Sequence, residues 1–271
     1  MKTQISTLLV AVACCQVAIS ASAADDDKRL AKGIQDNSFL IEEAYNQDAD
    51  VVQHITNLRR QGRDWVFMFT QEWPIGSQTH QFSYSVPYLW LKGDQGKVDG
   101  FGEIFLNYRY QALAETDRLP AFAPRLSLIL PSGDREKETG NESLGTQLNL
   151  PFSKIVSDRV TLHANAGLTS YFDVDGRRPT SYNLGGSVVL ALTRETNLLF
   201  ETVGEWTESV DAARDIERQF TLTMSPGVRH AFNLPNDKQV VVGAGAPISF
   251  SNGSVDYGAF FYLSLEHKFL R

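Results

Sequence analysis

Cysteine is nearly absent from this sequence, and the little there is lies at the very start. Of 271 residues only Cys14 and Cys15 are cysteine. If this first stretch is removed, the remaining chain has no thiol, no disulfide and no cysteine metal site. Lipidation at one of the two is an alternative, but the preceding Ala11-Val12-Ala13 matches a lipoprotein cleavage box poorly.

Both cysteines fall within a stretch that has the layout of a secretory signal peptide. Lys2 supplies the positive charge, Ile5 to Ile19 form the apolar region, and Ala21-Ser22-Ala23 fits the cleavage site. We therefore expect residues 1–23 to be removed and the mature chain to begin at Ala24. Residues 24–50 are then an N-terminal lead-in or a plug segment, and residues 51–271 the main domain.

Other absences exclude further classes. After residue 24 there is no apolar run of about 18 residues, so no mature transmembrane helix is expected. The net charge of −7 argues against a nucleic-acid partner. The five histidines lack ligand spacing, and Asp173-Val174-Asp175-Gly176 lacks the downstream acid of a calcium loop. We expect no metal and no cofactor.

The stretch Asp256–Phe269, DYGAFFYLSLEHKF, is the clearest positive signal in the sequence. Tyr257, Phe261 and Leu263 alternate with polar or small residues, as the two faces of a strand require. The stretch is longer than the roughly 9–11 residues that a tilted strand needs to cross a bilayer. It resembles the closing strand of an outer-membrane barrel, with Phe269 as the aromatic end that the barrel-insertion machinery would read.

The same alternation recurs from Val51 onward, with polar turns between the segments and no convincing helical period. Such a run predicts an all-β protein. We expect about twelve strands, with a range of 10–14, near these segments: Val51–Leu58, Asp64–Trp73, His80–Leu91, Gly100–Gln111, Pro124–Leu130, Thr146–Phe152, Val160–Phe172, Ser181–Thr193, Asn197–Trp206, Arg218–Ala231, Gln239–Ile248 and Asp256–Phe269.

Alternation alone fits both a soluble sandwich, with apolar residues inside, and a membrane barrel, with apolar residues toward lipid. Aromatic residues near strand ends, such as Trp65, Trp90 and Trp206, favour the barrel because they are typical of interface girdles. The fold class predicted is therefore an antiparallel transmembrane β-barrel in the bacterial outer membrane, surrounded by its lipid.

Connection lengths predict its orientation. With strand one running outward, the outward connections are mostly long and charged, Pro131–Ser143 being the longest, and the inward ones are mostly tighter. Long outer loops and short inner turns are the outer-membrane pattern, and an even strand number places both termini in the periplasm.

Several short motifs, taken in order, resemble one known family. They are Asn37–Gln47 (NSFLIEEAYNQ), Thr70–Pro74 (TQEWP), Leu106–Tyr110 (LNYRY), Leu130–Asp134 (LPSGD), Gln147–Pro151 (QLNLP) and His163–Gly167 (HANAG). Together they resemble the outer-membrane proteins described by the meta-pathway of phenol degradation. The resemblance implies a Gram-negative outer-membrane barrel, often described as a transporter of small aromatic or other hydrophobic molecules.

The polar parity of the strands gives the candidate lumen residues. We predict that these face inward and set selectivity: Glu103, Asn107, Arg109, Arg125, His163, Asn165, Glu201, Glu205 and Arg229. Because charges in a narrow lumen need partners, we expect the glutamates to counter the arginines. Acid/base work or cation binding by these glutamates is a weaker alternative.

His163 and Asn165, two residues apart, leave an enzyme open, as base and orienter beside a serine of a lipase-like site. No spacing identifies that serine, so no catalytic residue is assigned. Gly243, Gly245 and the Gly185-Gly186 pair lie within strands and indicate close packing or bending rather than phosphate binding.

Residues 37–47 leave two placements open, a plug within the lumen or a periplasmic tether, and their pattern fits a strand and a short helix equally. The function expected is passive passage of a small solute of hydrophobic or aromatic type, with Pro131–Ser143 narrowing the mouth. The alternatives are the barrel enzyme and a structural barrel without conductance.

Overall fold

The computed structural model describes residues 34, 36–93, 96–211 and 213–269. The expected signal peptide at residues 1–23 lies outside the described residues. No helix in the described part of the chain is long and apolar enough to cross a membrane.

Regular structure in the described residues is β-strand throughout. The strands are β1 (Val51–Gln61), β2 (Asp64–Ile75), β3 (Ser77–Gly93), β4 (Gly96–Phe101), β5 (Ile104–Tyr110), β6 (Ala121–Phe122), β7 (Arg125–Leu130), β8 (Gly145–Ser157), β9 (Val160–Tyr171), β10 (Thr180–Ala191), β11 (Thr196–Val210), β12 (Ile216–Leu234), β13 (Lys238–Gly245), β14 (Ile248–Ser251) and β15 (Ser254–Lys268).

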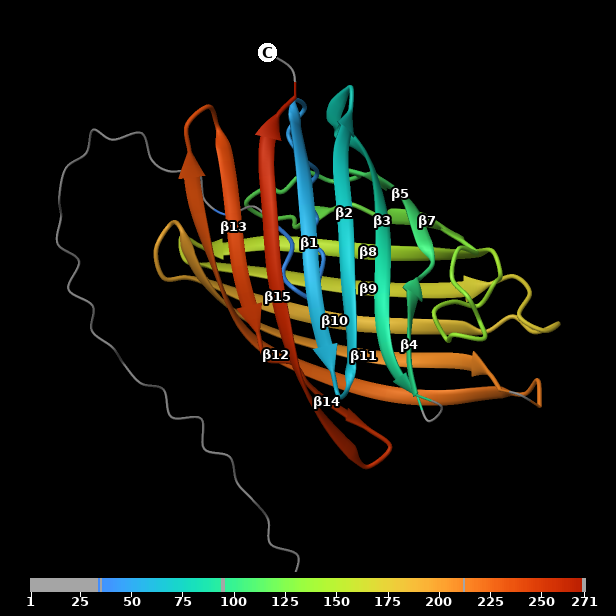
Figure 1. The fold of residues 1–271 in the computed structure, drawn as a ribbon. Helices are drawn as coiled ribbons and strands as arrows, with labels where there is room; N and C mark the ends of the chain where they lie inside the picture. The colour runs from blue at the N-terminus through green and yellow to red at the C-terminus, as the bar shows by residue number, and fades with distance from the viewer. Residues whose placement is uncertain (1–33, 35, 94–95, 212, 270–271) are drawn as a thin grey trace, which may run out of the picture. The chain divides into compact units, whose positions relative to one another are not determined.

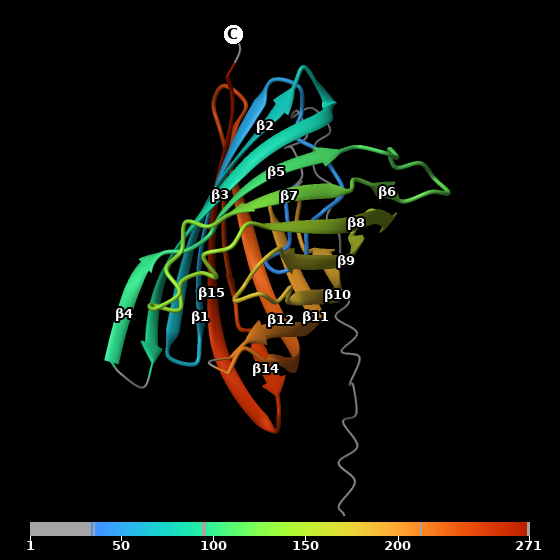
Figure 2. The ribbon, with the colours of Figure 1, turned by 90° about the vertical axis from the view of Figure 1, so that its right-hand side faces the viewer.

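These strands form one closed antiparallel barrel (Figures 1 and 2). Neighbours along the chain pair with each other, and β1 closes the barrel on β15, from Val51 opposite Lys268 to Gln61 opposite Gly258. At three places around the barrel, two successive strands together fill one strand position. These pairs are β4 with β5, β6 with β7, and β13 with β14, so the fifteen strands occupy twelve positions. The predicted number of twelve is confirmed, and closure removes the open edges that a sheet would expose.

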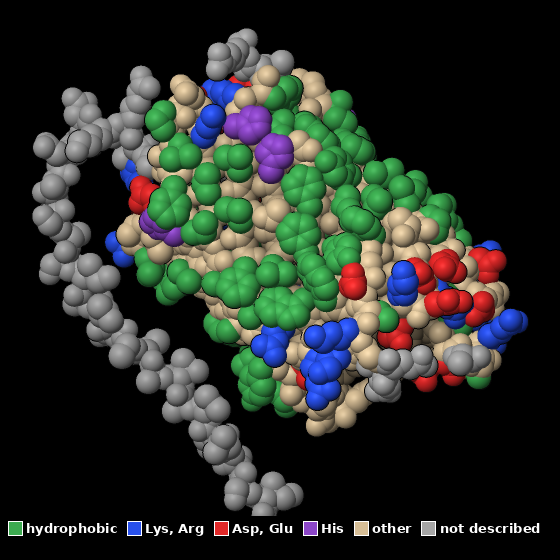
Figure 3. Space-filling model, viewed as in Figure 1, with side chains coloured by type: hydrophobic (Ala, Val, Ile, Leu, Met, Phe, Trp, Pro, Cys, Tyr) green, Lys and Arg blue, Asp and Glu red, His purple; other side chains and the backbone are tan. Residues whose placement is uncertain are grey.

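The apolar side chains face outward, which decides between the sandwich and the membrane barrel. On β7, Leu126 is 55% exposed while the next residue, Ser127, is 1% exposed. On β11, Phe200 is 46% exposed beside the fully buried Glu201. A soluble sandwich would show the reverse, because water would face the polar side chains. Figure 3 shows the resulting apolar surface over the face that β15 and β1–β3 form.

The two ends of the barrel differ. The N-terminal end of β1 and the C-terminal end of β15 meet at one end, where Phe269 N–H donates to the Asp50 carbonyl at 3.0 Å. We refer to this as the terminus end. The opposite end, the loop end, carries the connections at residues 131–144, 172–179 and 211–215. Turns at the terminus end are shorter, except for residues 111–120.

Residues 36–47, hereafter the N-terminal segment, run inside the barrel before β1 begins (Figure 2). Asp36, Ile41 and Ala44 are 1%, 2% and 0% exposed. The segment is neither strand nor helix, so the strand and the short helix that its pattern allowed were both wrong. Its backbone groups bond to side chains of the barrel wall instead of to each other, and the sequence pattern of the segment does not contain those partners.

Candidate functional site: the lumen and its N-terminal segment

Lumen side chains satisfy the backbone of the N-terminal segment one group after another. The carboxylate of Glu201 accepts the N–H groups of Leu40 and Ile41 at 2.8 and 3.1 Å. The amide of Asn165 bonds both backbone groups of Glu42, accepting its N–H at 2.8 Å and donating to its carbonyl at 2.9 Å. Two of the predicted lumen residues therefore bind the backbone of residues 40–42, which belongs to no strand.

The second half of the segment is held in the same way. Ala44 N–H donates to Ser153 Oγ at 2.7 Å, and Gln111 donates to the Ala44 carbonyl at 2.8 Å while accepting from Asn46 N–H at 3.0 Å. Gln47 N–H donates to Gln81 at 2.8 Å. Since a buried backbone group without a partner costs on the order of 1–3 kcal/mol, this matched set fixes the segment in register with the wall.

Two buried arginines bind carbonyl oxygens of the segment. Arg109, 3% exposed, donates to Asn46 Oδ1 at 2.8 Å and to the Tyr45 carbonyl at 2.8 Å. Arg229, 2% exposed, donates to the carbonyls of Asp36 and Asn37, both at 2.7 Å. Each guanidinium has several donors in a fixed plane, which suits it to gather successive carbonyls of an irregular chain.

The side chains of Glu42 and Arg125 form an ion pair between segment and wall. Arg125 Nε lies 3.0 and 2.9 Å from the two Glu42 carboxylate oxygens, and its Nη2 also contacts that carboxylate. Arg125 further donates to Asn107 at 3.0 Å and to Gln147 at 2.8 Å. The pair is mostly shielded, with side chains 14% and 25% exposed, so its interaction is stronger than that of a surface pair.

Phe39 anchors the segment in an apolar socket on the wall. Its ring stacks on that of Phe260 with centroids 5.1 Å apart and lies 5.7 Å from Tyr262. A Cβ built on Gly227 or Gly243 would lie 2.5 or 2.6 Å from the ring, so the socket requires glycine at both positions. The close packing predicted for the strand glycines is confirmed here, and also at Gly185, where a Cβ would meet Ile41 at 2.6 Å.

The two neighbouring glutamates of the segment have pKa values shifted in opposite directions. Burial raises the pKa of Glu43 to about 8, and the nearby Asp36 adds to the shift. Burial also acts to raise the pKa of Glu42, but the Arg125 guanidinium outweighs it and holds that pKa below its usual value. Glu42 is thus ionised and Glu43 largely protonated at neutral pH.

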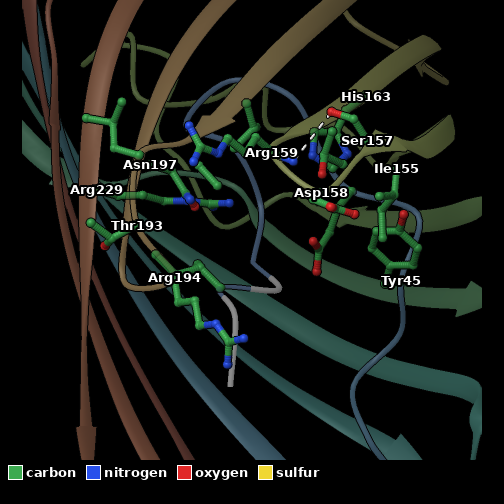
Figure 4. A pocket seen from close by; sticks show the side chains of 16 residues that line it. Tyr45, Ile155, Ser157, Asp158, Arg159, His163, Thr193, Arg194, Asn197 and Arg229 are labelled. Atoms are coloured by element: carbon green, nitrogen blue, oxygen red, sulfur yellow. Dashed lines mark hydrogen bonds between the residues drawn. The ribbon is translucent and has the colours of Figure 1, made fainter. Parts of the chain in front are cut away.

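The segment separates two cavities. The loop-end cavity, 610 Å³, is lined mostly by polar side chains such as Asn57, Thr70, Ser85 and Asn183, with apolar contacts from Phe39, Ile55 and Met68. The terminus-end cavity, 570 Å³, is lined mainly by polar and basic residues (Figure 4), including Glu43, Tyr45, His163, Arg159, Arg194, Asn197 and Arg229. In Figure 4, Arg229 reaches from β12 toward the N-terminal segment.

The predicted lumen residues divide into two groups. Arg109, Arg125, Asn165, Glu201 and Arg229 bond the N-terminal segment directly, as described above. The others lie elsewhere on the wall. Asn107 donates to Ser83 at 3.1 Å, and Glu205 lines the loop-end cavity. Glu103 accepts the N–H of Asn141, at 2.8 Å, and so holds the 131–144 connection. Whether the set governs selectivity stays a prediction.

In the described residues the predicted glutamates and arginines form no direct ion pair, although Arg229 acts electrostatically on Glu201. Among the described residues no ion pair within 4.0 Å joins Glu103, Glu201 or Glu205 to an arginine. Arg109 lies 4.0 Å from Glu72, and Arg125 pairs with Glu42 of the segment. For Glu201, Arg109 and Arg229 the N-terminal segment supplies the partners instead, through its N–H and carbonyl groups.

Several contact residues were missed that strand parity would have found. Glu72 and Gln81 have the inward parity of β2 and β3, are 6% and 2% exposed, and bond each other at 2.8 Å. Ser264 also has inward parity and donates to Asp36 at 2.8 Å. Tyr262, beside it, bonds the same carboxylate. Inward parity is the signal in the sequence that identifies all four of these residues.

A serine also lies beside His163, as the enzyme alternative required. Ser153 Oγ is 2.7 Å from His163 Nδ1, and both side chains are buried. The same Ser153 oxygen accepts the N–H of Ala44, so the pair is part of the contact with the N-terminal segment. No group of three or more potential metal ligands occurs among the residues that the structure describes.

The barrel is similar to solved structures of outer-membrane proteins. An outer membrane channel from Pseudomonas putida F1 has a similar structure, with a TM-score of 0.62 at 12% identity over 83% of this chain and 98% of that one. The NanC porin gives a TM-score of 0.51 at 8% identity over 79% and 98% of the respective chains. The comparison with curated protein sequences found no match.

The barrel therefore has the fold of outer-membrane channels. The family model described as "Putative MetA-pathway of phenol degradation" matches residues 43–265. Since the match spans most of the sequence, the chain belongs to this family, and the resemblance seen in the short motifs is confirmed.

Proposed function

We propose that the protein is an outer-membrane channel that passes a small solute through the barrel, and that the N-terminal segment gates it. The observation that carries the proposal is the division of one lumen into two cavities of 610 and 570 Å³ by a segment held through side-chain contacts alone. No strand pairing ties residues 36–47 to the wall, so they can leave it without opening the barrel.

The lining of the loop-end cavity supports a small aromatic molecule that carries a polar group. Phe39, Ile55 and Met68 provide apolar contact, and Asn57 and Thr70 provide hydrogen-bonding groups close by. Polar side chains make up most of the rest of the lining, so the solute should carry groups that they can bond as well as an apolar ring. The family's description, phenol degradation, agrees with this solute class.

Orientation and targeting belong to the same proposal. The longer loops lie opposite the termini, which supports placing the terminus end in the periplasm. Residues 1–23 would then direct export. The outward face of β15, which ends near the exposed Phe269, would be read by the barrel-insertion machinery.

Single-channel conductance of the refolded mature chain in a planar bilayer tests the channel. We expect small discrete steps, since the segment narrows the lumen, with altered size in Arg109→Ala and Glu201→Ala. Arg177→Ala is the matched control, because Arg177 pairs with Asp215 on exposed loops. A folded, inserted barrel that stays silent with the wild-type sequence and with both lumen variants would refute the open-channel proposal and favour a structural barrel.

The barrel enzyme is the second candidate, favoured only by the Ser153–His163 contact of 2.7 Å. One contact argues against this candidate, because Ser153 Oγ already accepts a hydrogen bond from the N–H of Ala44.

A further inference from the structure

The outer surface of the barrel carries an aromatic groove at the loop end of β2–β4. Six aromatic side chains line most of it: Phe67, Phe69, Tyr84, Tyr88, Trp90 and Phe101. The groove has a volume of 580 Å³ and lies on the face that Figure 3 shows in green. Phe101 is 60% exposed and Trp90 44%, so the groove is open to whatever surrounds the barrel.

Strand register places basic residues along the loop-end rim of this groove. Arg60 stands opposite Trp65, which stands opposite Trp90, so the three form a row across β1, β2 and β3. The Arg60 guanidinium lies 5.9 Å from the centre of the Trp65 ring. One step further toward the loop end, Lys92 of β3 stands opposite Lys97 of β4, and Arg63 lies in the β1–β2 turn.

These four basic residues, Arg60, Arg63, Lys92 and Lys97, are all exposed, and none forms an ion pair with another described residue. Other basic residues at the loop end are paired: Arg135 with Asp175, Arg177 with Asp215 and Arg218 with Glu208. Two acids lie at this rim. Asp64 accepts the backbone N–H of Lys92 at 2.8 Å, and Asp99 bonds the Tyr88 hydroxyl. Figure 3 shows Lys and Arg gathered just below the aromatic surface.

The lysine pair is informative because like charges placed directly opposite on an antiparallel pair destabilise it. An anion between Lys92 and Lys97 would remove that repulsion. The groove adjoining the rim is apolar, so the complementary ligand has phosphate groups at one end and hydrocarbon chains at the other. Aromatic belts lie at the level of lipid headgroups, which puts the basic rim at the height of those phosphates.

We propose that this face binds one molecule of lipopolysaccharide, with the lipid A phosphates against the basic rim and acyl chains along the aromatic groove. The assignment to this lipid, and not to a phospholipid of the other leaflet, rests on the proposed outward orientation of the loop end. It does not depend on whether the lumen conducts.

Lipid binding to the purified, folded full-length mature barrel in detergent tests the site, with native mass spectrometry as the readout. The probes are bisphosphorylated lipid A, dephosphorylated lipid A and phosphatidylglycerol. Bisphosphorylated lipid A is expected to bind at least tenfold more tightly than the other two. Replacing Arg60, Arg63, Lys92 and Lys97 together by serine is expected to remove that difference.

A matched control replaces Arg135, Arg177, Arg218 and Lys137, which pairs with Asp134, by serine, and is expected to change lipid A binding less than twofold. Trp90→Ser with Phe101→Ser tests the groove and is expected to weaken lipid A binding about tenfold while the rim stays intact. Mobility of the unheated barrel on a denaturing gel checks that every variant is folded.

Three results would overturn the proposal. The first is equal loss in the control set, which would indicate nonspecific attraction of anions. The second is binding of dephosphorylated lipid A as tightly as the bisphosphorylated form. The third is preferential binding of phosphatidylglycerol, which would place the loop end in the inner leaflet and so contradict the orientation rather than the channel.

Discussion

The ring of Phe39 stacks on the ring of Phe260 inside the barrel, with centroids 5.1 Å apart and planes inclined by 22°. One residue comes from the segment that precedes the first strand and the other from the last strand. The contact therefore joins the two ends of the domain within the lumen. It is the apolar part of an attachment that is otherwise made of hydrogen bonds.

Removing the Phe39 ring should loosen the segment. We expect Phe39→Ala to weaken docking by about 3 kcal/mol, roughly a hundredfold, as for other buried phenylalanines. The measurement is the rate at which a maleimide labels Ala44→Cys, a fully buried site. The expected mature chain begins at Ala24 and has no other cysteine, so the label reports this position alone.

Gly243→Val should reproduce the effect from the wall, because its Cβ would lie 2.6 Å from the Phe39 ring. Phe261→Ala is the control, since Phe261 follows the socket residue Phe260 on β15 but faces outward, 49% exposed. Unchanged labelling in both Phe39→Ala and Gly243→Val, with Phe261→Ala also unchanged, would show that the socket does not hold the segment.

Breaking the Glu42–Arg125 ion pair should also release the segment. We expect Arg125→Gln to cost about 2 kcal/mol of docking, since it leaves the Glu42 carboxylate shielded and unpaired. Glu42→Gln should cost less. In the double variant the two losses should not add, because residues in direct contact share one interaction. Labelling of Ala44→Cys in all four backgrounds measures this coupling, and strict additivity would argue against the pair.

Docking should weaken as pH rises, because of Glu43. Its pKa is about 8 in the docked segment, against 4.5 for an ordinary glutamate. The docked state holds the proton more tightly. Docking is therefore strongest below about pH 4.5 and weakens toward pH 8, by up to about 1.4 kcal/mol per pH unit. Glu42, whose pKa is lowered, has the opposite dependence, but only below its usual pKa.

The measurement is channel open probability between pH 5 and 8, which should rise in the wild-type protein and stay level in Glu43→Gln. Glu136→Gln, an exposed loop substitution at the other end, should keep the wild-type slope. A wild-type open probability that falls as pH rises would show that another group controls the segment.

His163→Ala separates the channel from the enzyme. Ser153 would lose its partner at 2.7 Å and bind Ala44 N–H less well, so we expect docking to weaken by about 1 kcal/mol, roughly fivefold in labelling rate. His80→Ala is the control, since His80 bonds Tyr108 on the outer face. Ester hydrolysis by the wild-type barrel that disappears in folded His163→Ala would instead establish the enzyme.

Strand parity determined much of this protein from sequence alone. The alternation in Asp256–Phe269 gave the faces of β15 correctly, with Phe261 exposed and Ser264 fully buried. The count of strands and the inward direction of Arg109, Asn165, Glu201 and Arg229 followed in the same way. These features are local, because side chains two residues apart share a face wherever the strand lies.

The tertiary structure alone decided what fills the lumen. Residues 36–47 have no periodicity that identifies their partners, and those partners are spread over the whole barrel, from Gln81, 34 positions away, to Ser264, 228 positions away. Parity showed that Arg109 and Glu201 face inward but not that they meet backbone groups there. Only closure of the barrel brings the wall residues to the distance at which they bind an irregular chain, so the glutamate–arginine pairing inferred from charge was replaced by contacts to the segment.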